Sequence, residues 1–119
     1  MTTDPLRSAA AGIALIAMGG ERHGHILRAN QALAALLASS PDALVGTRIC
    51  DHVHPQDRAR VDEAFLALMA DADRLHEGDV RLIASDGGSV AVRAVASVIA
   101  RRGGRAVVLR VLAAPSRRA

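Results

Sequence analysis

The fold of this chain is decided by residues 53–69, which read VHPQDRARVDEAFLALM. Pro55 suits the first position of a helix, where its missing N–H is not needed, and Asp57 places a negative charge beside the free amides of the first turn. Apolar residues then recur at the spacing of one helical face, namely Val61, Ala64, Phe65 and Leu68. The segment therefore predicts an amphipathic helix whose apolar face needs a sheet to cover it.

Length and composition predict a single domain with a core of small side chains. The chain has 119 residues, half of them apolar. It contains one Phe, Phe65, and neither Tyr nor Trp. Ala, Val, Leu and Ile must fill the core, so either the elements approach closely, which dense protein packing favours, or volume stays open for a guest. Because Cys50 has no second cysteine to pair with, we expect a reducing, cytoplasmic setting. The apolar run at residues 9–18 is too short to span a bilayer, so we expect no membrane partner.

Charge is distributed unevenly along the chain. Every basic residue is Arg; residues 1–86 carry 8 of them and all 12 acids, whereas residues 87–119 carry 7 Arg and no acid. A basic end can bind nucleic acid, but no aromatic residue lies near these arginines to stack on a base. We therefore expect a solvated face or an acidic protein partner, and we do not expect nucleic acid.

The first half of the chain predicts a hairpin followed by short helices. Strands at 13–18 and 25–29 flank a glycine-rich turn. Asn30 is then placed to cap one helix, and Ser40 with Pro41 to begin another. Before the hairpin, Asp4-Pro5 predicts a short N-terminal helix.

The last third predicts a three-stranded meander at residues 79–84, 89–100 and 105–112. On the middle strand Val90, Val92, Ala94, Ala96 and Val98 alternate with Ala91, Arg93, Val95, Ser97 and Ile99. The first set should face the long helix, and Val95 and Ile99 on the other face need a cover, either the N-terminal helix or another subunit. The sequence thus predicts an α+β fold, a five-stranded antiparallel sheet with helices packed on one face. We divide it into an N-terminal cap segment (1–11), the domain (12–114) and a basic tail (115–119).

Several motifs, taken in order, resemble a PAS domain over roughly residues 6–112. They are Ala29-Asn30 after the hairpin, the Leu36-Leu37 helix, the run Ser40-Pro41-Asp42-Ala43-Leu44-Val45-Gly46, then His54-Pro55-Gln56-Asp57, and Arg81-Leu82 before Ser85-Asp86-Gly87. Family domains often end in an Asp-Ile-Thr triplet that leads into a helical linker. This chain has Ala114-Pro115-Ser116 there, and Pro115 argues against a continuous helix.

The resemblance implies a sensory or protein-interaction module in signal transduction rather than an enzyme. A small apolar ligand would lie between the long helix and the sheet, against Ile49, Val53, Val61, Phe65, Leu68, Leu82, Val92 and Val98. Arg81 or Asn30 could add a polar contact. The alternative is a ligand-free module of a larger signalling protein that dimerises or docks through Val95 and Ile99; a homodimer or a signalling-protein partner is expected in either case.

Other chemistries find little support in the residues. The flavin-binding light-oxygen-voltage subgroup has its reactive Cys where this chain aligns Ile49, so we expect Cys50 to be buried and inert and the chain not to belong to that subgroup. The resemblance implies that a haem-binding member would carry its axial His on the long helix. That helix has no His here, so a haem would need His52, His54 or His76. The cofactor is thus unknown, with no specific signal for FMN or haem, and no spacing indicates a metal or catalytic site. An isomerase-like enzyme would need a buried acid, and Asp79, the acid nearest a strand, lies at the strand's edge.

Overall fold

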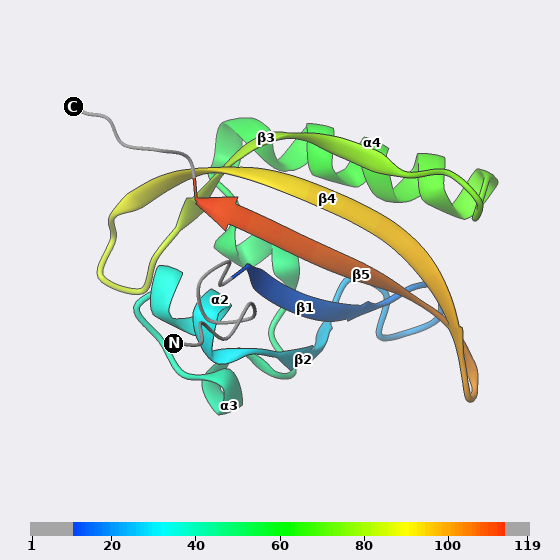
Figure 1. Cartoon of the computed structure of the whole chain (residues 1–119), viewed down its shortest axis with the longest axis horizontal. Helices are drawn as coiled ribbons and strands as arrows, with labels where there is room; N and C mark the ends of the chain where they lie inside the picture. Colours follow the sequence, from blue (N-terminus) through cyan, green and yellow to red (C-terminus); the bar gives the residue numbers. More distant parts are fainter. Residues whose placement is uncertain (1–10, 114–119) are drawn as a thin grey trace, which may run out of the picture.

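The computed structural model describes residues 11–113, which form one antiparallel sheet with helices on one of its faces (Figure 1). The elements are, in chain order, β1 (Gly12–Ala17), β2 (Ile26–Ala29), α2 (Gln31–Leu36), α3 (Pro41–Leu44), the 3-10 helices η1 (Ile49–His52) and η2 (Pro55–Asp57), α4 (Arg58–Ala70), β3 (His76–Ile83), β4 (Ser89–Arg101) and β5 (Gly104–Ala113). The expected N-terminal helix and the basic tail lie outside the described residues. No helix within 11–113 has the length and apolar character needed to cross a membrane.

The sheet has the order β2-β1-β5-β4-β3, with every neighbouring pair antiparallel. Strand β1 pairs with β5 from Gly12 opposite Val111 to Ala17 opposite Ala106, which places the first hairpin beside the closing meander. The predicted α+β fold with five antiparallel strands is thereby confirmed. In Figure 1, α2 and α3 lie at the β1–β2 end, and α4 lies at the β3–β4 end.

The helix caps are the ones that the sequence predicts. Asn30 accepts a hydrogen bond at Oδ1 from the N–H of Leu33 (3.0 Å), and its Nδ2 donates to the carbonyl of Ala11 (3.0 Å). The same Oδ1 also accepts from the N–H of Ile13 at 2.9 Å, so that one side chain begins α2 and ties it to β1. Ser40 caps α3 by accepting from the N–H of Ala43.

Helix α2 lies very close to β1, and Gly12 makes this possible. A Cβ atom on Gly12 would be 3.0 Å from the Cα of Leu33 and 3.1 Å from its Cβ. Both neighbouring atoms belong to the rigid part of a buried helix residue, which cannot move aside cheaply. The absence of a side chain at residue 12 is therefore a packing requirement.

Two elements begin more than one residue away from where the sequence predicts. Strand β3 begins at His76 rather than at residue 79, because residues 76–78 pair with β4 while the polar side chain of Glu77 reaches Arg93 (3.0 Å). Hydrophobic alternation cannot reveal such a polar edge segment. The long helix also begins in two steps, with the 3-10 turn η2 before α4, and Asp57 makes no side-chain cap at its start.

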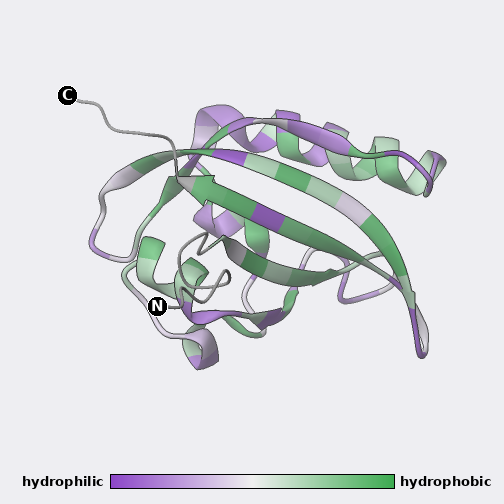
Figure 2. Cartoon of the chain, viewed as in Figure 1, coloured by the Kyte–Doolittle hydropathy of each residue, from purple (hydrophilic) through white to green (hydrophobic). Residues whose placement is uncertain are grey.

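The core lies between the sheet and the helices. Its fully buried large side chains are Ile16, Ile26, Leu33, Leu37, Leu44, Leu68, Val53, Val92, Val107 and Val111. Figure 2 shows β1 and most of β5 as hydrophobic, with hydrophilic residues in the first part of β3, in the first half of α4 and in the turns. Helix α4 buries two of its residues, Phe65 and Leu68, while Val61 and Ala64 on the same face are half-buried. The apolar face of α4 is thus incompletely covered.

Candidate functional site: a cavity beneath the long helix

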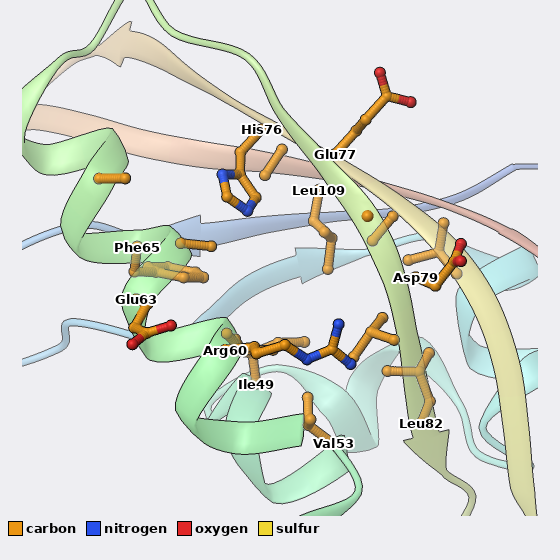
Figure 3. Close-up of a pocket in the computed structure, with 18 residues that line it drawn as sticks. Ile49, Val53, Arg60, Glu63, Phe65, His76, Glu77, Asp79, Leu82 and Leu109 are labelled. Atoms are coloured by element: carbon orange, nitrogen blue, oxygen red, sulfur yellow. The ribbon is translucent and has the colours of Figure 1, made fainter. Parts of the chain in front are cut away.

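A cavity of about 490 Å³ explains why the face of α4 is incompletely covered. It lies between α4, the segment around η1 and the inner face of strands β3, β4 and β5 (Figure 3). Its lining consists of Ile49, Val53, Arg60, Val61, Glu63, Ala64, Phe65, Ala67, His76, Glu77, Gly78, Asp79, Val80, Leu82, Ala94, Ala96, Leu109 and Val111. This volume falls within the range typical of small-molecule sites, roughly 300–1,000 Å³.

Small residues on both walls create the space. Gly78, Ala94 and Ala96 lie next to one another on the sheet floor, because Gly78 pairs with Ala94 on neighbouring strands. Ala64 and Ala67 face them from α4. The composition favoured close approach of the elements; instead the volume stays open, since α4 is held in place at its start and by its two buried side chains.

The start of α4 is fixed to β3 by backbone and side-chain contacts. Val53 forms a β-bridge with Leu82, and the N–H of His54 donates to the carbonyl of Arg81 at 2.9 Å. Asp57 is 3% exposed and accepts from the backbone N–H of Arg81 (2.9 Å), from its Nε (3.1 Å) and from its Nη2 (2.8 Å). These hydrogen bonds from Arg81, with a further one from Arg60, hold the pKa of the Asp57 carboxyl well below its ordinary value.

The eight residues expected around a ligand divide into two groups. Five of them, Ile49, Val53, Val61, Phe65 and Leu82, lie in the cavity wall. Leu68 and Val92 are buried in the core cluster outside that wall, and Val98 is half-buried against the same cluster. None of these three belongs to the lining of the cavity.

Arg81 and Asn30, the two residues that the sequence suggested as polar contacts for a ligand, instead make hydrogen bonds within the fold. Arg81 is bound to Asp57 and also donates from Nη2 to Oε1 of Gln56 at 3.2 Å. Both polar atoms of the Asn30 side chain form hydrogen bonds with backbone groups of Ala11, Ile13 and Leu33. Neither residue lines the cavity.

The sequence did not predict that polar residues line the cavity, although His76 and Asp79 were considered there for other roles. Figure 3 shows Arg60 reaching from α4 across the cavity and the His76 ring entering it from β3. Glu77 and Asp79 belong to its rim, but both bind Arg93, at 3.0 and 3.2 Å. Arg60 could have been found from its i, i+3 spacing to Asp57, whereas His76 lies before residue 79, where the sequence predicts that the strand begins.

Phe65 separates this cavity from a much smaller hollow. The hollow has a volume of about 30 Å³ and is lined by His23, Gly24, Arg48, Ile49, Cys50, Asp62 and Phe65. The His23 ring meets Phe65 edge to face, with centroids 5.7 Å apart and an interplanar angle of 85°. His23 Nδ1 accepts from the N–H of Gly19 at 2.7 Å, which fixes the ring in this orientation.

Cys50 and His52 both have hydrogen-bond partners nearby in the chain. Cys50 is half-buried, not buried as expected from the sequence. This partial burial raises the pKa of its thiol to about 11, and its Sγ donates to Oδ1 of Asp62 at 3.4 Å. Thr47 donates its hydroxyl hydrogen to the carbonyl of Leu44, so His52 Nε2 must donate to Thr47 Oγ1 (2.8 Å), and burial lowers the pKa of His52.

Within residues 11–113, no three His, Cys, Asp or Glu side chains are grouped so that they could hold a metal ion. The carboxylate of Asp79 is 81% exposed, which places it in solvent rather than in a buried acid site.

The outer face of the sheet carries a second group of apolar residues. Ile99 is 39% exposed and Val95 is half-buried, while Ile13 and Leu112 on neighbouring strands are 37% and 46% exposed. Register places Val95 and Ile13 on either side of Arg110. No described helix packs on this face, because α2, α3 and α4 all lie on the other side of the sheet (Figure 1).

Solved structures of similar fold come from several kinds of protein. The PAS domain of an HTR-like protein from Haloarcula marismortui is 14% identical, with a TM-score of 0.76 over 92% of this chain and 86% of that one. The PAS-B domain of Drosophila melanogaster Cycle with bound ethylene glycol is 15% identical (TM-score 0.73, 87% and 99%). A PAS domain from a two-component sensor histidine kinase is also 15% identical (TM-score 0.72, 92% and 89%). At these identities the likeness concerns the fold.

The sequence itself was compared with families and with curated proteins. No curated protein matches the chain. The family model described as PAS fold matches residues 26–112, which is most of the chain. PAS domains are generally sensory modules rather than enzymes. The chain therefore belongs to the PAS domain family, and it is a sensory or signalling module of that family.

Proposed function

We propose that this PAS domain senses a small apolar ligand, which binds between α4 and the sheet. The observation that carries the proposal is the cavity of about 490 Å³ with a mainly aliphatic lining. The cavity opens to solvent between α4 and β3, and a concave, mainly apolar surface with a few polar groups at its edge is the usual form of a small-molecule site. Binding rather than catalysis is the proposed activity, and a cytoplasmic location is proposed from the lone Cys50.

Native mass spectrometry with a cavity-blocking variant tests the proposal. Val61 lines the cavity from α4, so Val61→Trp should fill it, whereas Leu66, on the same helix and 63% exposed, provides a matched site outside it. We expect a bound molecule, or a thermal shift with a library of apolar compounds, in the wild type and in Leu66→Trp but not in Val61→Trp. Equal responses of the two variants would contradict the proposal, as would a wild type that binds nothing.

A second candidate function is ligand-free association of two copies through the outer face of the sheet. Here Glu77, Val95, Arg110 and Ile13 follow one another across strands β3, β4, β5 and β1. A face on which an acid and a base alternate with apolar residues along one row is suited to pairing with its own copy about a two-fold axis. Sedimentation at increasing concentration should show a dimer that Ile99→Asp dissociates and Leu66→Asp does not. A monomer at all concentrations would exclude this candidate.

A further inference from the structure

We infer that the cavity selects an apolar molecule with a carboxylate head group, and that Arg60 is the residue that binds the head group. The inference rests on the proposed function, because it names the class of ligand for the same cavity. Its basis is an imbalance of charge where the cavity wall meets the start of α4.

The imbalance comes from two guanidinium groups that share one carboxylate. Arg81 satisfies Asp57 through two side-chain hydrogen bonds and one backbone hydrogen bond. Arg60 adds a further contact, Nη2 to Oδ1 at 3.0 Å. Since the carboxylate carries one negative charge and Arg81 already matches it, the positive charge of Arg60 is surplus at this place.

Arg60 has hydrogen-bond capacity left for a ligand. A guanidinium has five N–H donors in a planar fork that suits a carboxylate. Within the described residues, the contact with Asp57 is the one polar contact that this guanidinium makes. The side chain lines the cavity and is 60% exposed, and Figure 3 shows it lying across the opening between α4 and β3.

The acids at the rim do not neutralise Arg60. Glu77 and Asp79 are bound to Arg93, and in Figure 3 their carboxylates point away from the cavity. Glu63 lines the cavity three residues after Arg60 but forms no ion pair with it in residues 11–113. Glu63 should therefore repel an anionic head group, which gives the inference two residues with opposite expected effects.

The test compares octanoate, octan-1-ol and octylamine, which share one alkyl chain and differ in the head group. The ring of Phe65 lines the cavity and is the chain's one phenyl group, so its NMR signals report occupancy and yield Kd values. We expect octanoate to bind roughly three- to tenfold more tightly than octan-1-ol, the range for a partly exposed charged contact. Arg60→Met keeps the apolar stem and should abolish this preference, Glu63→Gln should increase it, and Arg102→Met, in the exposed β4–β5 turn, should leave it unchanged.

The outcomes separate the inference from the proposed function. Binding of octan-1-ol or octylamine as tight as that of octanoate would overturn the role of the carboxylate while leaving the cavity a ligand site. An unchanged octanoate preference in Arg60→Met would overturn the role of Arg60. If none of the three compounds shifts the Phe65 signals, the proposed function fails, and the inference fails with it.

Discussion

Arg81 holds the carboxylate of Asp57 with its guanidinium and with its own backbone N–H, across a separation of 24 residues. The contact joins the turn before α4 to the edge strand β3. Because the cavity opens between these two elements, the pair sets the position of one wall relative to the other. A carboxylate that looks in the sequence like a helix-start residue is thus a tertiary anchor.

The first prediction concerns the pH dependence of this anchor. The pKa of Asp57 is lower in the folded chain than in the unfolded chain, so its contribution to stability is present above the ordinary Asp pKa of about 3.9 and declines as the pH falls below it. Asp57→Asn should therefore unfold at a lower urea concentration than the wild type at neutral pH, and the difference should narrow in acid. Asp79→Asn, at an exposed carboxylate, is the control. A difference that is independent of pH would contradict this account.

Gly12→Ala should destabilise the domain, since the new methyl group would lie 3.0 Å from the Cα of Leu33. Overpacking of this kind costs about 1–3 kcal/mol of unfolding free energy. Gly78→Ala is a matched change in another strand, where the added Cβ meets no atom within 4 Å. It should be neutral or slightly stabilising, because alanine restricts the unfolded chain. Urea unfolding of both variants checks this, and equal effects would refute the close contact of α2 with β1.

Ala94→Leu tests whether the space beneath α4 is real. Ala94 lines the cavity, so the larger side chain can enter it and bury apolar surface, at about 0.8 kcal/mol per methylene at most. We expect unchanged or raised unfolding free energy together with loss of ligand-induced thermal shifts. Ala91→Leu, at an exposed position of the same strand, should leave ligand responses intact. Strong destabilisation by Ala94→Leu would mean that the interior is already full.

Leu68 is the buried contact that fixes the second half of α4. Leu68→Ala should cost about 2–5 kcal/mol of unfolding free energy, as is usual for a large side chain removed from a core. Leu66→Ala, two residues earlier and 63% exposed, should change it by less than about 0.5 kcal/mol. Chemical unfolding measures both values. Similar costs would show that α4 is oriented differently.

Cys50 should react slowly with iodoacetamide, because burial raises its pKa to about 11 and the thiolate is the reactive form. At about pH 8 the alkylation rate should be on the order of a hundredfold below that of the same cysteine in the urea-unfolded chain, and it should rise steeply toward pH 11. Mass spectrometry of quenched samples measures the rate. Comparable rates in the folded and unfolded chain would contradict the raised pKa of this half-buried thiol.

Local signals in the sequence were sufficient for most of the fold. Asn30 and Ser40 cap the helices they were expected to cap, because a cap depends on residues a few positions away. Alternation along β4 likewise identified which residues face inward. By contrast, the partner of Asp57 lies 24 residues away, and local spacing cannot identify it. The cavity was also underestimated, since its volume depends on where α4 is held and not on composition alone.

Among residues 11–113, strand β4 alone separates the cavity from the outer face of the sheet at the centre of the cavity: Ala94 and Ala96 line the cavity, and Val95 between them faces the other way. If a bound ligand changed the twist of β4, the change would also move Val95 on the outer face, which is one residue away from Ala94 and Ala96. Communication between a bound molecule and a partner would then need no long relay through the structure. Double-mutant cycles joining neighbours on this strand are the natural place to look for such coupling.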